Sequence, residues 1–127
     1  VNKLGVVCGA ETGYKLRSNP DTVLAPDISF VSAERIPASG IPQTFWTQPP
    51  DLAVEVASPS DTLKGLDKKA RRWLAEGATL VWVVISRKRT ITVYQSSAST
   101  ITLTEADVLD GGSVVPGFSC PVANIFE

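Results

Sequence analysis

The chain has 127 residues, of which 43% are hydrophobic, and it carries 12 basic against 13 acidic side chains. This length predicts one domain spanning residues 1–127, and a net charge of −1 argues against a protein that coats nucleic acid by bulk attraction. The sequence contains no histidine, which excludes histidine-dependent nucleophiles, histidine general bases and histidine metal ligands. Any chemistry has to use carboxylates, lysines, hydroxyls or the two thiols.

The N-terminal part is predicted to form strands. Segments 1–8 and 12–17 indicate two strands around Gly9 and Gly13, followed by a loop over 18–22. Because the chain opens at its first valine and has no methionine, we expect it to be a fragment or the ordered part of a longer protein.

Two further strands and a long loop follow. Segment 27–32 (DISFVS) alternates polar and apolar residues as a half-buried strand does, and 34–50 is rich in Pro, Gly, Ser and Gln, which predicts an irregular stretch. In the next strand, 51–57 (DLAVEVA), alternation puts Asp51 and Glu55 on the face opposite the three large apolar side chains. A strand with so apolar a face is predicted to be central, with both acids near the core.

Residues 58–77 are predicted to form a helix with Asp61 as a capping acid. An internal glycine moves the expected start toward Leu66, and Gly77 is the expected stop. One apolar stripe runs along this helix and comprises Leu66, Ala70, Trp73, Leu74 and Gly77. Lys69 lies at the edge of the stripe, so its stem can follow buried surface and bring the ammonium group toward the sheet, whereas the lysine before it points to solvent.

The C-terminal half completes a mixed sheet. Segment 79–86 (TLVWVVIS) is apolar throughout and predicts a fully buried strand, joined by the basic turn 87–89 to another strand over 90–95. The order of strand, helix and buried strand indicates a right-handed crossover between parallel neighbours. A short strand is expected at 101–103, and the tail after the glycine turn at 111–112 is expected to close the core. The fold class is therefore α/β or α+β with a mixed sheet.

Cysteine and tryptophan are expected to serve the core. Cys8 and Cys120 are too far apart for a zinc-binding pair and are predicted to be buried thiols. Trp46, Trp73 and Trp82 are predicted to anchor the core or loops rather than to stack on bases. With no apolar run near the roughly 20 residues needed to span a bilayer, and no signal-peptide pattern, the chain is expected to be cytoplasmic.

The charges are unevenly distributed along the chain. Residues 64–89 carry eight basic and two acidic side chains, whereas the remainder carries four and eleven. The asymmetry fits a basic face, and it fits a solvated helix and turn equally well.

Three residues form a candidate catalytic site. Asp27 and Glu55 lie on separate strands, and two carboxylates on adjacent strands suit a hard divalent cation, Mg²⁺ or Mn²⁺. Lys69, on the following helix, can bind a phosphate oxygen or orient an attacking water. A bound metal lowers the pKa of that water, so no histidine is required. Asp51 is a further candidate metal ligand, although a strand-start role is favoured for it.

Both carboxylates also have structural explanations. An aspartate after proline, as at Asp27, is commonly a turn or capping residue. Glu55 could form an internal salt bridge with Lys69 or Arg72. The chain would then be a catalytically inactive binding or assembly module that keeps the fold without the activity.

The chain resembles the Uma-two family of endonucleases, of the PD-(D/E)XK restriction-endonuclease-like superfamily, in four ordered stretches: APDISFVSAERIP, PPDLAVEVASPSD, DKKARRWLAEGATLVWVVISRKRTITVYQ and VVPGFSCPVANIF. The resemblance covers nearly the whole chain and implies a mixed sheet flanked by helices, a Mg²⁺-dependent site and DNA as substrate. It matches the first acid of the family to Asp27 and the acid of the (D/E)XK element to Glu55. Ala57 stands where the pattern has lysine, and the lysine that the family takes from the next helix matches Lys69.

The resemblance has two further implications. A hairpin and a helix that precede the equivalent of Val1 in the family are expected to be missing from this chain. Because cutting both strands of a duplex normally needs two active sites, a homodimer is also expected.

Overall fold

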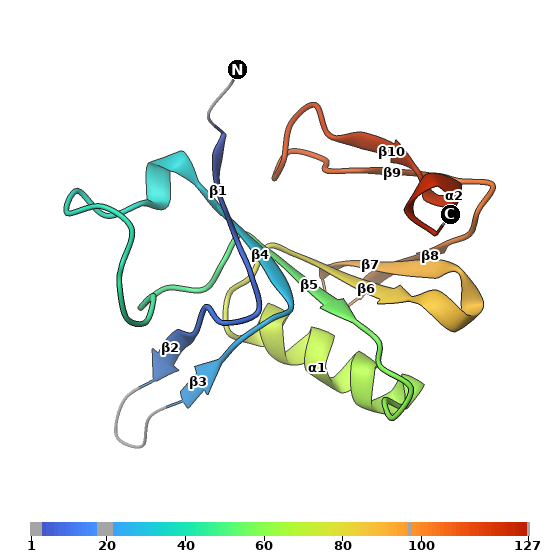
Figure 1. The fold of residues 1–127 in the computed structure, drawn as a ribbon, viewed down its shortest axis with the longest axis horizontal. Helices are drawn as coiled ribbons and strands as arrows, with labels where there is room; N and C mark the ends of the chain where they lie inside the picture. The colour runs from blue at the N-terminus through green and yellow to red at the C-terminus, as the bar shows by residue number, and fades with distance from the viewer. Residues whose placement is uncertain (1–3, 18–21, 97, 127) are drawn as a thin grey trace.

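The computed structural model describes residues 4–17, 22–96 and 98–126. Its centre is a six-stranded mixed sheet (Figure 1). The strands are ordered β1 (Gly5–Cys8), β4 (Ile28–Ser32), β5 (Leu52–Val56), β6 (Leu80–Ile85), β7 (Thr90–Ser96) and β8 (Ser99–Leu103). β5 and β6 are parallel, and every other neighbouring pair in this sheet is antiparallel. The expected α+β class with a mixed sheet is confirmed.

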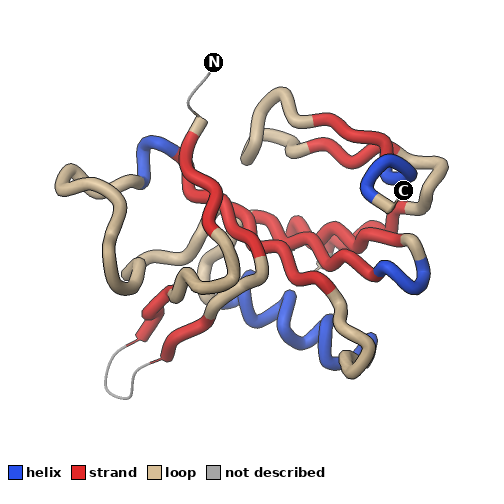
Figure 2. The backbone as a smooth tube through the Cα atoms, viewed as in Figure 1, coloured by secondary structure: helices blue, strands red, loops and turns tan. Residues whose placement is uncertain are grey.

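Smaller elements surround this sheet. They are β2 (Tyr14–Arg17) paired with β3 (Thr22–Leu24), β9 (Val108–Asp110) paired with β10 (Ser119–Pro121), the 3₁₀ turns η1 (Ala33–Arg35) and η2 (Ser86–Lys88), and the short helix α2 (Val122–Ile125). The long irregular stretch between η1 and β5 lies to one side of the sheet, as the composition of 34–50 predicts (Figure 2). The loop predicted at 18–22 lies almost entirely outside the described residues.

Helix α1 (Leu63–Ala75) connects the parallel strands and covers one face of the sheet. It begins three residues before the predicted start at Leu66, because the Thr62 hydroxyl accepts a 3.0 Å hydrogen bond from the amide of Gly65 and caps the helix. Its buried residues are Leu66, Ala70 and Trp73, from the predicted apolar stripe. Leu74 is only half-buried and Gly77 is exposed, since the helix has already ended there.

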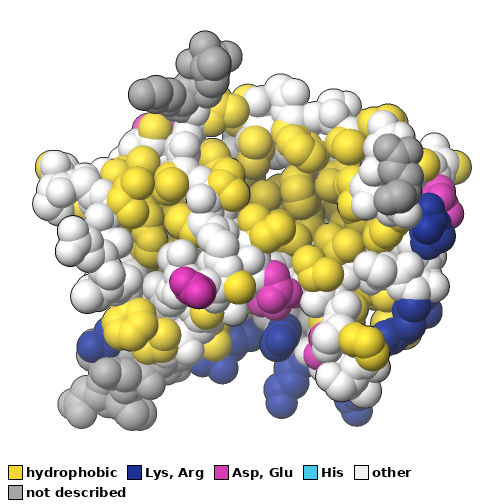
Figure 3. All heavy atoms as spheres, in the orientation of Figure 1, with side chains coloured by type: hydrophobic (Ala, Val, Ile, Leu, Met, Phe, Trp, Pro, Cys, Tyr) yellow, Lys and Arg dark blue, Asp and Glu magenta, His cyan; other side chains and the backbone are white. Residues whose placement is uncertain are grey.

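The opposite face of the sheet is packed against the C-terminal segment, as predicted. Leu109 and Val122 are buried against Leu80, Trp82 and their neighbours, and Figure 1 shows β9, β10 and α2 on the side away from α1. Apolar side chains surround a hollow between this segment and the sheet (Figure 3), which holds a pocket of about 400 Å³. Both faces of β5 and β6 are therefore covered, which explains their nearly continuous apolar sequences.

The predicted core residues are only partly confirmed. All three tryptophans are buried, and the rings of Trp46 and Trp73 lie against Tyr14. The expectation of buried thiols is wrong in degree: Cys8 and Cys120 are free and half-buried, because β1 is an edge strand and β10 belongs to a two-stranded hairpin. No helix within the described ranges is long and apolar enough to cross a membrane.

Candidate active site

Glu55 is the second-last residue of β5 and lies on the face of the sheet that packs under α1. Its neighbours on that face are apolar, because β5 alternates and the adjacent β6 is apolar throughout. The glutamate is only 5% exposed. A carboxylate this deeply buried is costly unless polar groups surround it, so its partners identify the site.

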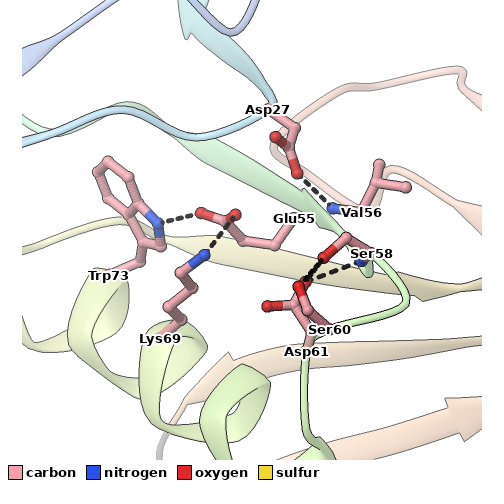
Figure 4. A network of polar contacts seen from close by, with 8 residues as sticks. All are labelled: Asp27, Glu55, Val56, Ser58, Ser60, Asp61, Lys69 and Trp73. Atoms are coloured by element: carbon pink, nitrogen blue, oxygen red, sulfur yellow. Dashed lines mark hydrogen bonds and ion pairs between the residues drawn. The ribbon is translucent and has the colours of Figure 1, made fainter.

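Two side chains from consecutive turns of α1 reach the Glu55 carboxylate (Figure 4). The indole Nε1 of Trp73 donates a 2.9 Å hydrogen bond to Oε2, and Nζ of Lys69 lies 3.9 Å from Oε1. Positions four apart share one face of a helix, which is why both can meet the same carboxylate. Lys69 is thus the salt-bridge partner that the sequence suggested, whereas Arg72 pairs with Glu76 at 3.0 Å.

Asp27 reaches the same end of the sheet through the strand register. Ile28 is the partner of Val54 in the antiparallel ladder, so extending the register by one residue places Asp27 opposite Glu55. Its Oδ2 accepts a 2.7 Å hydrogen bond from the amide of Val56 (Figure 4). The structure therefore brings Asp27, Glu55 and Lys69 together at the carboxyl end of β5.

The electrostatics of the site are dominated by the buried glutamate. Burial raises the pKa of the Glu55 carboxyl above its ordinary value. The hydrogen bond from Trp73 and the charge of Lys69 lower this pKa, and the charges of Asp27 and Asp61 raise it again, for a net upward shift. Burial is the largest of these causes, so the raised pKa reflects mainly the loss of hydration around this carboxylate.

Asp61 is the acidic residue whose influence on the site was missed. Its Oδ2 accepts hydrogen bonds from the amide and the hydroxyl of Ser58, at 2.8 and 3.0 Å, and these bonds lower the pKa of its carboxyl. It therefore closes the turn before α1, while the helix itself is capped by Thr62. The Ser-Pro-Ser-Asp sequence is a turn signal, and it could have indicated this role.

Asp51 is not brought to the site. It lies four positions before Glu55, a distance of about 13 Å at the usual rise of a strand. Its carboxylate accepts hydrogen bonds from the amide of Ser32, at 2.6 Å, and from Nη1 of Arg35, at 2.9 Å. Across the described part of the chain, no group of three or more His, Cys, Asp or Glu side chains could hold a metal ion.

The mixed sheet and crossover helix define an α+β fold with polar residues collected at the end of the parallel pair. The same fold occurs in a crystal structure titled "a putative nuclease belonging to DUF820" from Anabaena variabilis, with a TM-score of 0.83 and 19% identity over 98% of this chain and 69% of that one. The model of the Uma2 family, described as "Putative restriction endonuclease", matches residues 1–123. The chain therefore belongs to the Uma2 family, which confirms the resemblance to Uma-two. No curated protein matches it.

Proposed function

We propose that this protein is a metal-dependent endonuclease that hydrolyses DNA phosphodiester bonds with Asp27, Glu55 and Lys69. The observation that carries the proposal is the buried Glu55 carboxylate, which lies beside a second carboxylate and has a raised pKa. Burying a carboxylate is costly, and carboxylates whose pKa is perturbed by burial are concentrated at functional sites. Membership of a family described as "Putative restriction endonuclease" supports DNA as the substrate.

The donor set at this position fits Mg²⁺ or Mn²⁺. Both are hard cations that prefer oxygen ligands, and Mg²⁺ usually keeps several waters, so the carboxylates of Asp27 and Glu55 are enough protein ligands. A metal held there would supply a Lewis acid for the phosphate and lower the pKa of a bound water.

The remaining residues would orient the reacting groups. Trp73 holds Oε2 of Glu55, so the carboxylate keeps one rotamer and presents Oε1 on the side of Lys69. The Lys69 side chain is 58% exposed, so its ammonium group can donate to a phosphate oxygen of a substrate at the surface.

The structure offers less support for the inactive module. That alternative expects Glu55 and Lys69 to form a buried ion pair, but only the glutamate is buried. An ion pair open to water on one side contributes about 0–1 kcal/mol, which is a weak structural reason for placing a carboxylate in the core.

The proposal is tested by cleavage of supercoiled plasmid during titration with Mg²⁺ or Mn²⁺. Asp27→Asn and Glu55→Gln should each lower the cleavage rate by about 100-fold or more, and both changes preserve side-chain shape. Glu105→Gln is the matched control, because Glu105 is an exposed carboxylate paired with Arg89 outside the site. The proposal is wrong if the wild-type protein cuts no faster than the Asp27→Asn/Glu55→Gln double variant.

A further inference from the structure

The basic residues of segment 64–89 divide into two groups in the structure. Four form ion pairs, namely Lys69 with Glu55, Arg71 with Asp67, Arg72 with Glu76 and Arg89 with Glu105. The other four are exposed and form no ion pair with any described residue: Lys64, Lys68, Arg87 and Lys88. We call these four residues the basic edge.

The basic edge lies at the same end of the sheet as the candidate active site. β5 and β6 are parallel, so the start of α1, which follows β5, and η2, which follows β6, meet at their carboxyl ends. Arg87 borders a pocket with Ser58, and Lys88 borders another with Leu63. Figure 3 shows Lys and Arg side chains along the side of the molecule where α1 lies.

The arrangement of these charges opposes local stability. Lys64 and Lys68 are four residues apart on one helix face, where like charges repel. Lys64 also stands in the first turn of α1, which contains no acidic residue, and the helix dipole disfavours a cation there. Lys64 and Lys68 stand against this local preference without an ion pair to any described residue, which indicates a function outside the fold itself. Arg87 has only the electrostatic influence of Asp61 nearby.

A groove adjoins the basic edge, and its lining combines four threonines with apolar side chains and with Asp67, whose carboxylate accepts hydrogen bonds from Tyr94 and Arg71. The β7–β8 register sets Thr92 opposite Thr102, with their hydroxyls 3.2 Å apart, on the face that α1 covers only in part. Thr90 and Thr100 line the same groove, and Lys88 lies beside them. Hydroxyls and cations together are the usual protein partners of phosphate and sugar oxygens.

We propose that the basic edge binds the phosphate backbone of duplex DNA, with the threonine groove donating further hydrogen bonds. The proposal rests on the proposed function for the position of the scissile phosphate, at Asp27 and Glu55. A duplex is favoured over a single strand because single strands are bound on exposed aromatic rings. Tyr94, the aromatic side chain that lines a pocket with Lys88, is buried, and the half-buried ring of Phe126 already lies against the guanidinium of Arg89, 5.7 Å away.

The test compares two double variants that remove the same charge. Arg87→Gln/Lys88→Gln removes two unpaired cations of the basic edge, whereas Arg72→Gln/Arg89→Gln removes two cations that already have carboxylate partners. Binding to a short fluorescent duplex is measured by anisotropy in EDTA over a range of salt concentrations. Each lost phosphate contact lowers the slope of log K against log salt by about 0.9, so the first variant should lose about 2 from the slope.

The control variant, Arg72→Gln/Arg89→Gln, should retain at least half of the slope that the first variant loses. Equal loss of slope in both variants overturns the proposal, because only net charge would then matter. Tighter binding of duplex RNA than of duplex DNA overturns it as well.

The DNA-binding role of the basic edge and the nuclease activity can be refuted separately. If the Arg87→Gln/Lys88→Gln variant binds with the wild-type slope while wild-type protein cuts DNA, only the basic edge is refuted. If the slopes change as expected and wild-type protein does not cut, only the nuclease is refuted.

Discussion

The indole nitrogen of Trp73 donates a 2.9 Å hydrogen bond to the carboxylate of Glu55, and this bond joins the middle of α1 to the end of β5. Both side chains are buried, at 2% and 5% exposure. The bond is shielded from water, and its acceptor is charged when the carboxyl is ionised. A hydrogen bond contributes most to the free energy of unfolding under these two conditions.

Trp73→Phe is therefore expected to destabilise the protein through Glu55 as well as through packing. Removing the donor should cost about 1.5–3 kcal/mol of unfolding free energy, measured in urea. Trp82→Phe is the matched control, because Trp82 is buried and its Nε1 has no hydrogen-bond partner. The role assigned to the Trp73 bond is contradicted if both substitutions cost the same.

Glu55→Gln should leave the protein at least as stable as the wild type at neutral pH. The pKa of Glu55 is raised above its ordinary 4.5, so between these two values the folded state binds more protons than the unfolded state. Wild-type stability should fall as pH rises through this window and then level off, and the fall should be absent in the variant. Thermal melting across the acidic range measures the difference.

Asp67→Asn should change the pH dependence of stability in the opposite direction to Glu55→Gln. The hydrogen bonds from Tyr94 and Arg71 lower the pKa of the Asp67 carboxyl below its ordinary 3.8. The stability that it contributes should be present above that ordinary value and be lost as pH falls through the lowered one. Similar pH profiles for the two variants would count against both assignments.

Asp51→Asn is expected to affect stability and not catalysis. Its carboxylate joins the amide of Ser32 to the guanidinium of Arg35, and an asparagine can accept only part of this pair of hydrogen bonds. The loss should be about 1–3 kcal/mol in chemical unfolding. Metal-dependent cleavage, measured where the variant is fully folded, should match the wild type. If the folded variant instead loses metal-dependent cleavage, Asp51 is a metal ligand and this assignment is wrong.

Neither tyrosine of the chain should ionise near pH 10, the ordinary pKa of a phenol. Burial raises the pKa of Tyr14 to about 12, and burial followed by the hydrogen bond to Asp67 raises that of Tyr94 to about 12. The folded state therefore holds its phenol protons more tightly, and stability should be lost as pH rises from 10 toward 12. Phenolate absorbance should develop only there, or together with unfolding. Absorbance that rises near pH 10 while circular dichroism stays native would contradict the burial of both rings.

The central part of the fold follows from patterns in the sequence. Strict alternation in 51–57 and the apolar run of 79–86 indicate β5 and β6, and the stripe through Leu66 and Trp73 indicates α1. The structure begins that helix three residues before the predicted start, because the Thr62 cap offsets the cost of the internal glycine. β3 and the β9–β10 hairpin were also missed, since strands of three residues leave no periodicity to detect.

The candidate site was predicted in part. An acid inside an apolar strand marks Glu55, and the helical wheel selects Lys69 over its neighbour. Trp73 was assigned to the core alone, because the direction of an indole N–H depends on the rotamer and on the packing of the helix. The separation of Asp51 from Glu55 could have been estimated from strand geometry, and the structure adds its partner, Arg35.

By itself, the sequence determined which chemistry is possible and which residues could perform it. The absence of histidine leaves carboxylates and lysine, and the local periodicities assign Asp27, Glu55 and Lys69 to two strands and a helix. Only the tertiary structure decided that they meet. The register that sets Asp27 opposite Glu55, and the docking of α1 that brings Trp73 and Lys69 to one carboxylate, depend on contacts between residues far apart in the chain. Local patterns carry no information about such contacts, because these depend on how whole elements pack together.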